Sequence, residues 1–194
     1  MFMPMQTEPH AVRTLINRAG GDERLRELIL YVAEKCHDDP CFGATMLNKI
    51  LFFSDFATYL NLGEPITGVE YRALPNGPAP LRLVQNRGKL ERDGDIRMVS
   101  IPTQRGEQKR VVPLRSHKAQ IFTESELAIV DAVIAGLGGF TANDVSEISH
   151  GAAWRSVSEN DLIPYETAFV SDAEITDDDK RWAMHLAKDD GVVA

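Results

Sequence analysis

Apolar residues recur at helical spacing near the start of the chain. Five of them lie three or four positions apart and so share one helical face: Leu25, Leu28, Ile29, Val32 and Cys36. Asp22 precedes this run and is a suitable N-cap. Proline disfavours helical backbone at the residue before it, so the helix should end before Pro40. The pattern predicts one amphipathic helix here.

The next apolar run covers most of a helical circumference. It extends from Met46 to Leu60, with Thr45 as a plausible N-cap and Gly63 as a stop. A helix that is apolar nearly all round belongs in the middle of a fold. We therefore expect it to be the central helix.

A polar and aromatic stripe interrupts this central helix. Asn48, Phe52, Asp55 and Tyr59 fall on one face, and Lys49 lies beside them. Polar groups on a buried helix must be hydrogen-bonded internally or must face a groove. Both alternatives are open at this point, and internal bonding is the commoner case.

The stretch YRALPNGPAP, residues 71–80, combines three prolines with an Asn-Gly pair. Side chains alternate in character along the chain up to Leu74. This alternation predicts an extended segment with Tyr71 near its end. Asn76 and Gly77 suit a turn with positive φ, and Pro80 suits the first turn of a following helix, which Gly94 would stop.

Later segments contain further start and stop signals. Residues 96–102 and 109–115 predict a β-hairpin, with Pro113 confined to an edge. Thr123 and Thr141 each open a helix, and residues 163–170 are apolar enough to pack on the core. Thr176 begins a final amphipathic helix.

These elements indicate an α+β fold that is mainly α-helical. We expect a single domain with a central buried helix and a small antiparallel β-sheet or hairpin. The domain should span residues 22–187, between a flexible segment at residues 1–21 and a frayed tail at residues 188–194.

Charge is distributed unevenly along the chain. The net charge is −8, but residues 72–118 carry eleven basic and four acidic residues, a local charge of +7. Such a segment either faces nucleic acid or an acidic partner, or forms a solvated face of mixed sign. No signal peptide and no apolar run of about 18 residues is present. We expect a cytoplasmic protein that does not enter the membrane.

The reactive residues do not form a recognisable catalytic or metal-binding set. Cys36, His37 and Cys41 lack the spacing and the second pair that a zinc site requires. Ser149 and His150 are adjacent, and neighbouring helix positions point about 100° apart, so they are poorly placed to act as nucleophile and base. We expect no enzyme activity, no metal and no cofactor.

Residues 126–150 have the outline of a helix-turn-helix, but their charge has the wrong sign. No Lys or Arg lies between Lys118 and Arg155, whereas DNA-reading helices present such residues to phosphates and bases. No aromatic residue between Tyr71 and Phe122 offers a stacking platform for single strands. A DNA-associated transcriptional regulator that binds duplex backbone through the basic segment remains the alternative function.

Residues 47–80 resemble the signature of the Panacea, or SocA-like, antitoxin family. The resemblance rests on Lys49, Leu51, Phe53 and Asp55 in the helix, on GEPITG at residues 63–68, and on Tyr71 followed by the Gly-Pro-x-Pro of residues 77–80. VSEISHGAAW, residues 145–154, is also similar to a family segment. Asn76 departs from the pattern, since many relatives have histidine there.

The resemblance implies a non-catalytic protein that neutralises a cognate protein toxin, either by occluding it or by delivering it as an adaptor to an AAA+ protease. No cofactor is implied, and we expect no nucleic-acid partner. The candidate partner-binding residues lie on the helix stripe, in and after YRALPNGPAP, and in the last motif: Asn48, Lys49, Phe52, Asp55, Tyr59, Tyr71, Arg72, Asn76, Pro78, Arg82, Arg87, His150 and Trp154.

Overall fold

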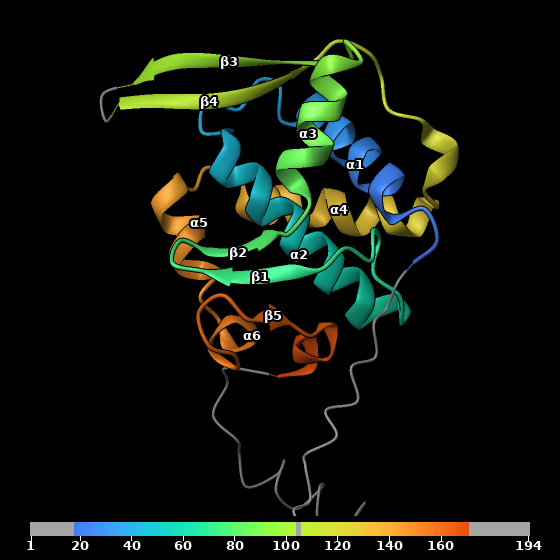
Figure 1. Cartoon of the computed structure of the whole chain (residues 1–194), viewed down its shortest axis with the longest axis vertical. Coiled ribbons are helices and arrows are strands. Elements are labelled where there is room, and N and C mark those ends of the chain that lie inside the picture. Colours follow the sequence, from blue (N-terminus) through green and yellow to red (C-terminus); the bar gives the residue numbers. More distant parts are fainter. Residues whose placement is uncertain (1–17, 104–105, 171–194) are drawn as a thin grey trace, which may run out of the picture.

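The computed structural model describes residues 18–103 and 106–170, and Figure 1 shows their arrangement. The predicted helix after Thr176, the tail at residues 188–194 and most of the predicted N-terminal segment lie outside the described residues. Six α-helices and two small antiparallel sheets are described. The predicted α+β, mainly helical class is confirmed.

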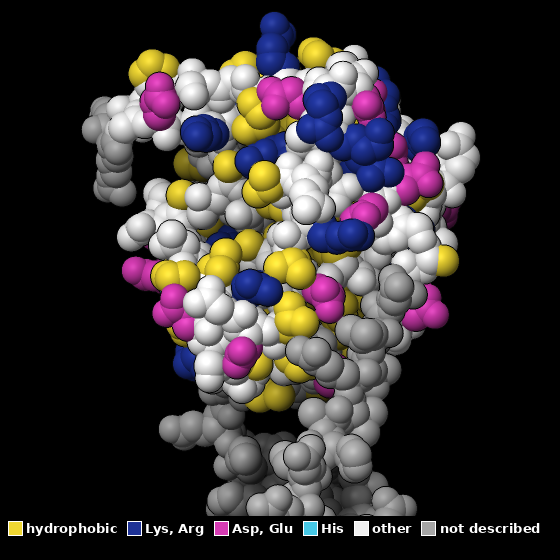
Figure 2. Space-filling view, in the orientation of Figure 1, with side chains coloured by type: hydrophobic (Ala, Val, Ile, Leu, Met, Phe, Trp, Pro, Cys, Tyr) yellow, Lys and Arg dark blue, Asp and Glu magenta, His cyan; other side chains and the backbone are white. Residues whose placement is uncertain are grey.

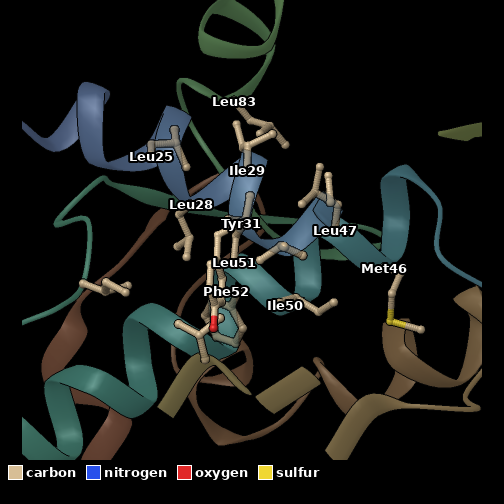
Figure 3. Packing of buried hydrophobic residues seen from close by; sticks show 14 of the residues in the cluster. Leu25, Leu28, Ile29, Tyr31, Met46, Leu47, Ile50, Leu51, Phe52 and Leu83 are labelled. Carbon is tan, nitrogen blue, oxygen red and sulfur yellow. The ribbon is translucent and has the colours of Figure 1, made fainter. Parts of the chain in front are cut away.

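Helix α2 (Ala44–Leu62) is the centre of the fold, as its apolar pattern predicts. It packs against α1 (Gly21–Lys35), α4 (Glu124–Leu137), α5 (Ala142–Ile148), strands of both sheets and the 3-10 helix η2 (Tyr165–Phe169). Leu28 and Ile29 of α1 meet Leu47 and Leu51 of α2 in the core (Figure 3), and all four are fully buried. Burying such side chains is the main favourable term in folding.

The predicted N-caps of the first two helices are wrong. Gly20 caps α1 and Gly43 caps α2, and neither Asp22 nor Thr45 makes a capping bond. The Asp22 carboxylate instead accepts from Arg82 Nη1 at 2.6 Å and from Asn86 Nδ2 at 2.9 Å. A tertiary ion pair thus overrides the local capping preference. The end of α2 at Gly63 is confirmed.

The sheet built on YRALPNGPAP differs from the prediction. Strand β1 (Tyr71–Leu74) pairs antiparallel with β2 (Gly77–Pro80) and with β5 (Leu162–Ile163), in the order β2-β1-β5. Pro80 therefore lies in a strand opposite Tyr71, and the next helix, α3 (Leu83–Arg92), begins only at Leu83.

Prolines are tolerated in β2 because it is an edge strand and because of its register. Pro78 lies opposite Ala73. The Ala73 N–H donates to Asp161 O at 2.9 Å, on the side away from β2, so the ladder requires no donor from Pro78.

The remaining elements follow their local signals. Strands β3 (Ile96–Thr103) and β4 (Gly106–Pro113) form the predicted hairpin, and capping boxes at Thr123 and Thr141 open α4 and α5. The short helix α6 (Ala152–Arg155) follows, and Tyr165 of η2 is buried as expected. Within residues 18–103 and 106–170 no single helix has the length and apolar character to cross a membrane, although α4 and α5, bent by 117°, meet these criteria as a pair.

Part of the basic segment is paired within the protein. Arg82, Arg115 and Lys118 form ion pairs with acidic residues of α1. Burial raises the pKa of Glu27, but the hydrogen bonds and positive charges of Arg115 and Lys118 together outweigh burial and hold this pKa below its ordinary value. Figure 2 shows Lys and Arg side chains gathered over α3 with Asp and Glu among them. This face is of mixed sign.

Candidate functional site

Lys49 attaches the central helix to the turn between β1 and β2. Its Nζ donates to Asn76 O at 2.5 Å and to Pro78 O at 3.2 Å. The side chain is only 2% exposed, and this burial lowers the pKa of Lys49 to about 8. An ammonium group surrounded by carbonyl oxygens fixes the position of the turn backbone.

Gly77 is placed where no larger residue fits. Its φ is +88°, in the left-handed region, and a Cβ there would collide with Ser149 Oγ and lie 2.5 Å from Lys49 Nζ. The predicted positive φ is therefore confirmed for Gly77. Asn76 does not share it, because among the described non-glycine residues only Asn160 has positive φ.

The segment after α4 supports the same turn from its other side. Ser146 Oγ donates to Asn76 O at 3.1 Å, and Trp154 Nε1 donates to Leu74 O at 3.0 Å. The His150 ring lies against Trp154, with centroids 4.2 Å apart. Figure 1 shows α5 beside the β1–β2 turn. Two motifs about 70 residues apart therefore converge on one short turn.

Ser149 Oγ donates to Ser146 O at 2.7 Å. It is thus engaged in its own helix, and its residue is 2% exposed. In the part of the chain that the structure describes, no group of three His, Cys, Asp or Glu could hold a metal ion. Burial raises the pKa of the Cys36 thiol to about 11, so its sulfur is a protonated core group.

Asp55 fixes the loop that precedes β1. Its carboxylate is fully buried and accepts from Thr67 N at 2.6 Å, Thr67 Oγ1 at 2.5 Å and Tyr71 OH at 2.7 Å. Burial raises the pKa of Asp55, while these donors act in the opposite direction. Three donors on one buried carboxylate hold the Ile-Thr-Gly loop against α2.

The candidate residues form two groups and some outliers. Lys49, Asn76, Pro78, His150 and Trp154 surround the β1–β2 turn. The second group lies in the interior: Phe52, Asp55 and Tyr71 are buried, and Tyr59 is half-buried at the edge of the core. Arg82 and Arg87 belong to the α3 region and are not brought to the turn.

Internal hydrogen bonding, the first alternative for the helix stripe, applies to Lys49 and Asp55. Three other candidates differ: Asn48 Oδ1, Arg72 Nε and His150 Nε2 are buried atoms with no hydrogen-bond partner within the described residues. Buried polar atoms are nearly always bonded, so these three atoms are exceptions to the general rule.

Sequence reasoning did not include Thr67, Gly77, Ser146 or Ser149 among the site residues. Each lies in a motif that was recognised, and the serines fall three residues apart on one helical face. Their role depends on contacts between distant segments, which spacing alone does not reveal.

A search of curated proteins and a search of solved structures each gave no match. The family described as Antitoxin SocA-like, Panacea domain, matches residues 47–155, which is more than half of the chain. This match begins just before Lys49 and ends just after Trp154, so it encloses the described side chains that bond to the β1–β2 turn. The chain belongs to the SocA-like Panacea domain family of antitoxins.

Proposed function

We propose that this protein is a non-catalytic cytoplasmic antitoxin that neutralises a cognate protein toxin by binding it through the surface around the β1–β2 turn. Membership of the family implies a toxin partner in general. One observation supports the choice of surface: the side chains of Lys49, Ser146 and Trp154 all donate hydrogen bonds to the backbone of residues 74–78.

A turn held in this way is suited to binding. Pro75 and Asn76 are exposed at its tip, while the backbone on both sides is fixed from beneath. A surface that is rigid before it meets its partner loses less conformational entropy on binding.

The buried candidates contribute indirectly. Phe52, Asp55 and Tyr71 shape the loop and the strand from within, so we assign them a positioning role. Asn76, His150 and Trp154 are the side chains we expect to meet the toxin.

Binding permits either route of neutralisation. The toxin is blocked while it is bound, or it is passed to an AAA+ protease. Pulse-chase measurement of toxin half-life distinguishes them: delivery shortens the half-life when the antitoxin is present, and occlusion leaves it unchanged or longer.

The test is co-expression with the product of the adjacent open reading frame. We expect that product to arrest growth alone, and this protein to restore growth and to co-purify with it. A neighbouring product that is harmless alone, or two proteins that never associate, would contradict the proposal.

The alternative function, duplex DNA binding by the basic segment, has less support. Arg82, Arg115 and Lys118 pair with α1 acids and are not available to phosphates without breaking those pairs. Phosphate binding would make affinity fall with salt, with a slope of about 0.9 per contact. A gel-shift at low salt therefore tests it directly.

A further inference from the structure

An apolar groove of about 510 Å³ lies between α2, α4, the segment from the end of α5 through α6, and the end of η2. None of the described residues that line it is charged, and Ser149 and Thr167 are its polar members. The groove is separate from the hydrogen bonds that hold the β1–β2 turn. Ser149 connects the two places, because it lines the groove and also lies against Gly77.

The groove is lined by large buried side chains, among them Phe52, Phe56 and Leu137, and by small residues. Ala57, Gly136 and Gly151 are among the lining residues, and they leave room for another backbone to approach closely. At the rim, Leu60 is 48% exposed and Ile148 is 44% exposed. Single exposed apolar residues are ordinary, but several around one apolar groove indicate an interaction site.

The charges on the surrounding elements indicate what binds there. Helices α4 and α5 contain no Lys or Arg, and Glu147 and Glu166 are exposed on α5 and η2. Among the described residues of the wall elements, Arg155 of α6 is the exposed base, and its Nη1 donates to His150 O. An apolar occupant with basic flanks is therefore complementary.

Two occupants from within the protein are less complementary. Residues 171–194 carry three basic and seven acidic residues, a net charge of −4, the same sign as the exposed Glu147 and Glu166. A second copy of the chain, with its net charge of −8, has the same sign.

We propose that this groove binds an amphipathic helix of a protein partner whose apolar face is flanked by Lys or Arg. If the partner is the toxin, this proposal rests on the proposed function. It then specifies which kind of toxin segment is recognised. Helix-in-groove binding places apolar side chains at positions i, i+3, i+4 and i+7 into the groove. Ser149 lines the groove and lies against Gly77, so the groove adjoins the β1–β2 turn.

The test uses synthetic helical peptides of about 16 residues with an apolar stripe. One peptide has Lys flanks, a second has Glu flanks, and a third has Ser in place of its apolar residues. Binding to the full-length protein is measured by fluorescence anisotropy. The variants Leu60→Lys and Ile148→Lys place a like charge at the rim, and Val84→Lys, at an exposed apolar position on α3 outside the groove, is the control.

We expect the Lys-flanked peptide to bind the unmodified protein and Val84→Lys equally. Each rim variant should weaken this binding by at least about tenfold, equivalent to about 1.4 kcal/mol. The Glu-flanked and Ser-substituted peptides should bind at least about tenfold more weakly to the unmodified protein. A photo-crosslinking residue at position 60 should attach to the peptide, and in co-expressing cells to one helix of the toxin.

Equal binding of the Lys- and Glu-flanked peptides, unchanged binding in both rim variants, or crosslinks to a second copy or to residues 171–194 would overturn the proposal. If these results come with restored growth in co-expression, the antitoxin function stands and the groove assignment falls. If the peptide results hold but the adjacent gene product is harmless, the groove stands as a helix-binding site and the antitoxin function falls.

Discussion

The ammonium nitrogen of Lys49 and the carbonyl oxygen of Asn76 are 2.5 Å apart, which joins the central helix to the tip of the β1–β2 turn. The same nitrogen also donates to Pro78 O. The contacts of this buried lysine are therefore with backbone carbonyls, and no carboxylate is paired with it in the described residues. Burial disfavours the charged form of Lys49. In return, its hydrogen bonds fix the backbone of the turn.

Lys49 should make stability depend on pH in a defined direction. Its pKa is lowered from 10.5 to about 8 in the folded protein, so the unfolded chain binds more protons between these values. Stability should therefore rise with pH across this window, by about 3 kcal/mol in total. The neutral amine still donates to both carbonyls.

The measurement is urea unfolding of the unmodified protein and of Lys49→Met from pH 7.5 to pH 10.5. Cys36 and the buried tyrosines titrate in both proteins, so their effects cancel in the difference. Parallel stability curves would contradict a lowered pKa of Lys49 in the folded protein.

Gly77→Ala should destabilise the protein more than a left-handed backbone alone explains. The new Cβ meets Ser149 Oγ and Lys49 Nζ, and the expected loss is at least about 3 kcal/mol, from strain and overpacking together. Gly94→Ala is the matched control, because Gly94 has φ +77° with nothing within 4 Å of the added Cβ. Its loss should be about 1 kcal/mol. Equal losses in thermal or urea unfolding would mean that the turn is loosely packed.

Asp55→Ala should be among the most damaging polar substitutions. It leaves Thr67 N, Thr67 Oγ1 and Tyr71 OH without an acceptor in the core, at a cost of about 3 kcal/mol or more. Asp55→Asn keeps one acceptor oxygen and should lose less. Asp93→Ala, on the exposed end of α3, should leave the free energy of unfolding almost unchanged. A small effect of Asp55→Ala in urea unfolding would remove the role assigned to this carboxylate.

Much of the fold was predictable because local signals and tertiary contacts agree. The apolar circumference of α2 places it at the centre, and the capping boxes at Thr123 and Thr141 mark where α4 and α5 begin. The β3–β4 hairpin follows from two alternating segments around a glycine-containing loop. Each signal lies within a few residues of the feature it specifies.

The predictions are wrong where contacts between distant residues determine the local structure. Asp22 has the chemistry of an N-cap but bonds to Arg82 and Asn86, about 60 residues away. The β2 strand looks like a turn because of its prolines, and only the direction of the Ala73 N–H toward Asp161 explains why they fit. The supports of the turn from Ser146 and Trp154 were likewise hidden in the sequence.

The most direct test of the central claim is the affinity of the purified toxin complex when the tip of the turn is changed. Asn76→Arg places a large side chain on the exposed tip without disturbing its buried supports, and Gln85→Arg adds the same group at an exposed position on α3. We predict that Asn76→Arg weakens toxin binding by at least about tenfold, or about 1.4 kcal/mol, while Gln85→Arg leaves it unchanged. Equal toxin affinity of the unmodified protein and Asn76→Arg, with both variants folded, would contradict the claim that the toxin binds around the β1–β2 turn.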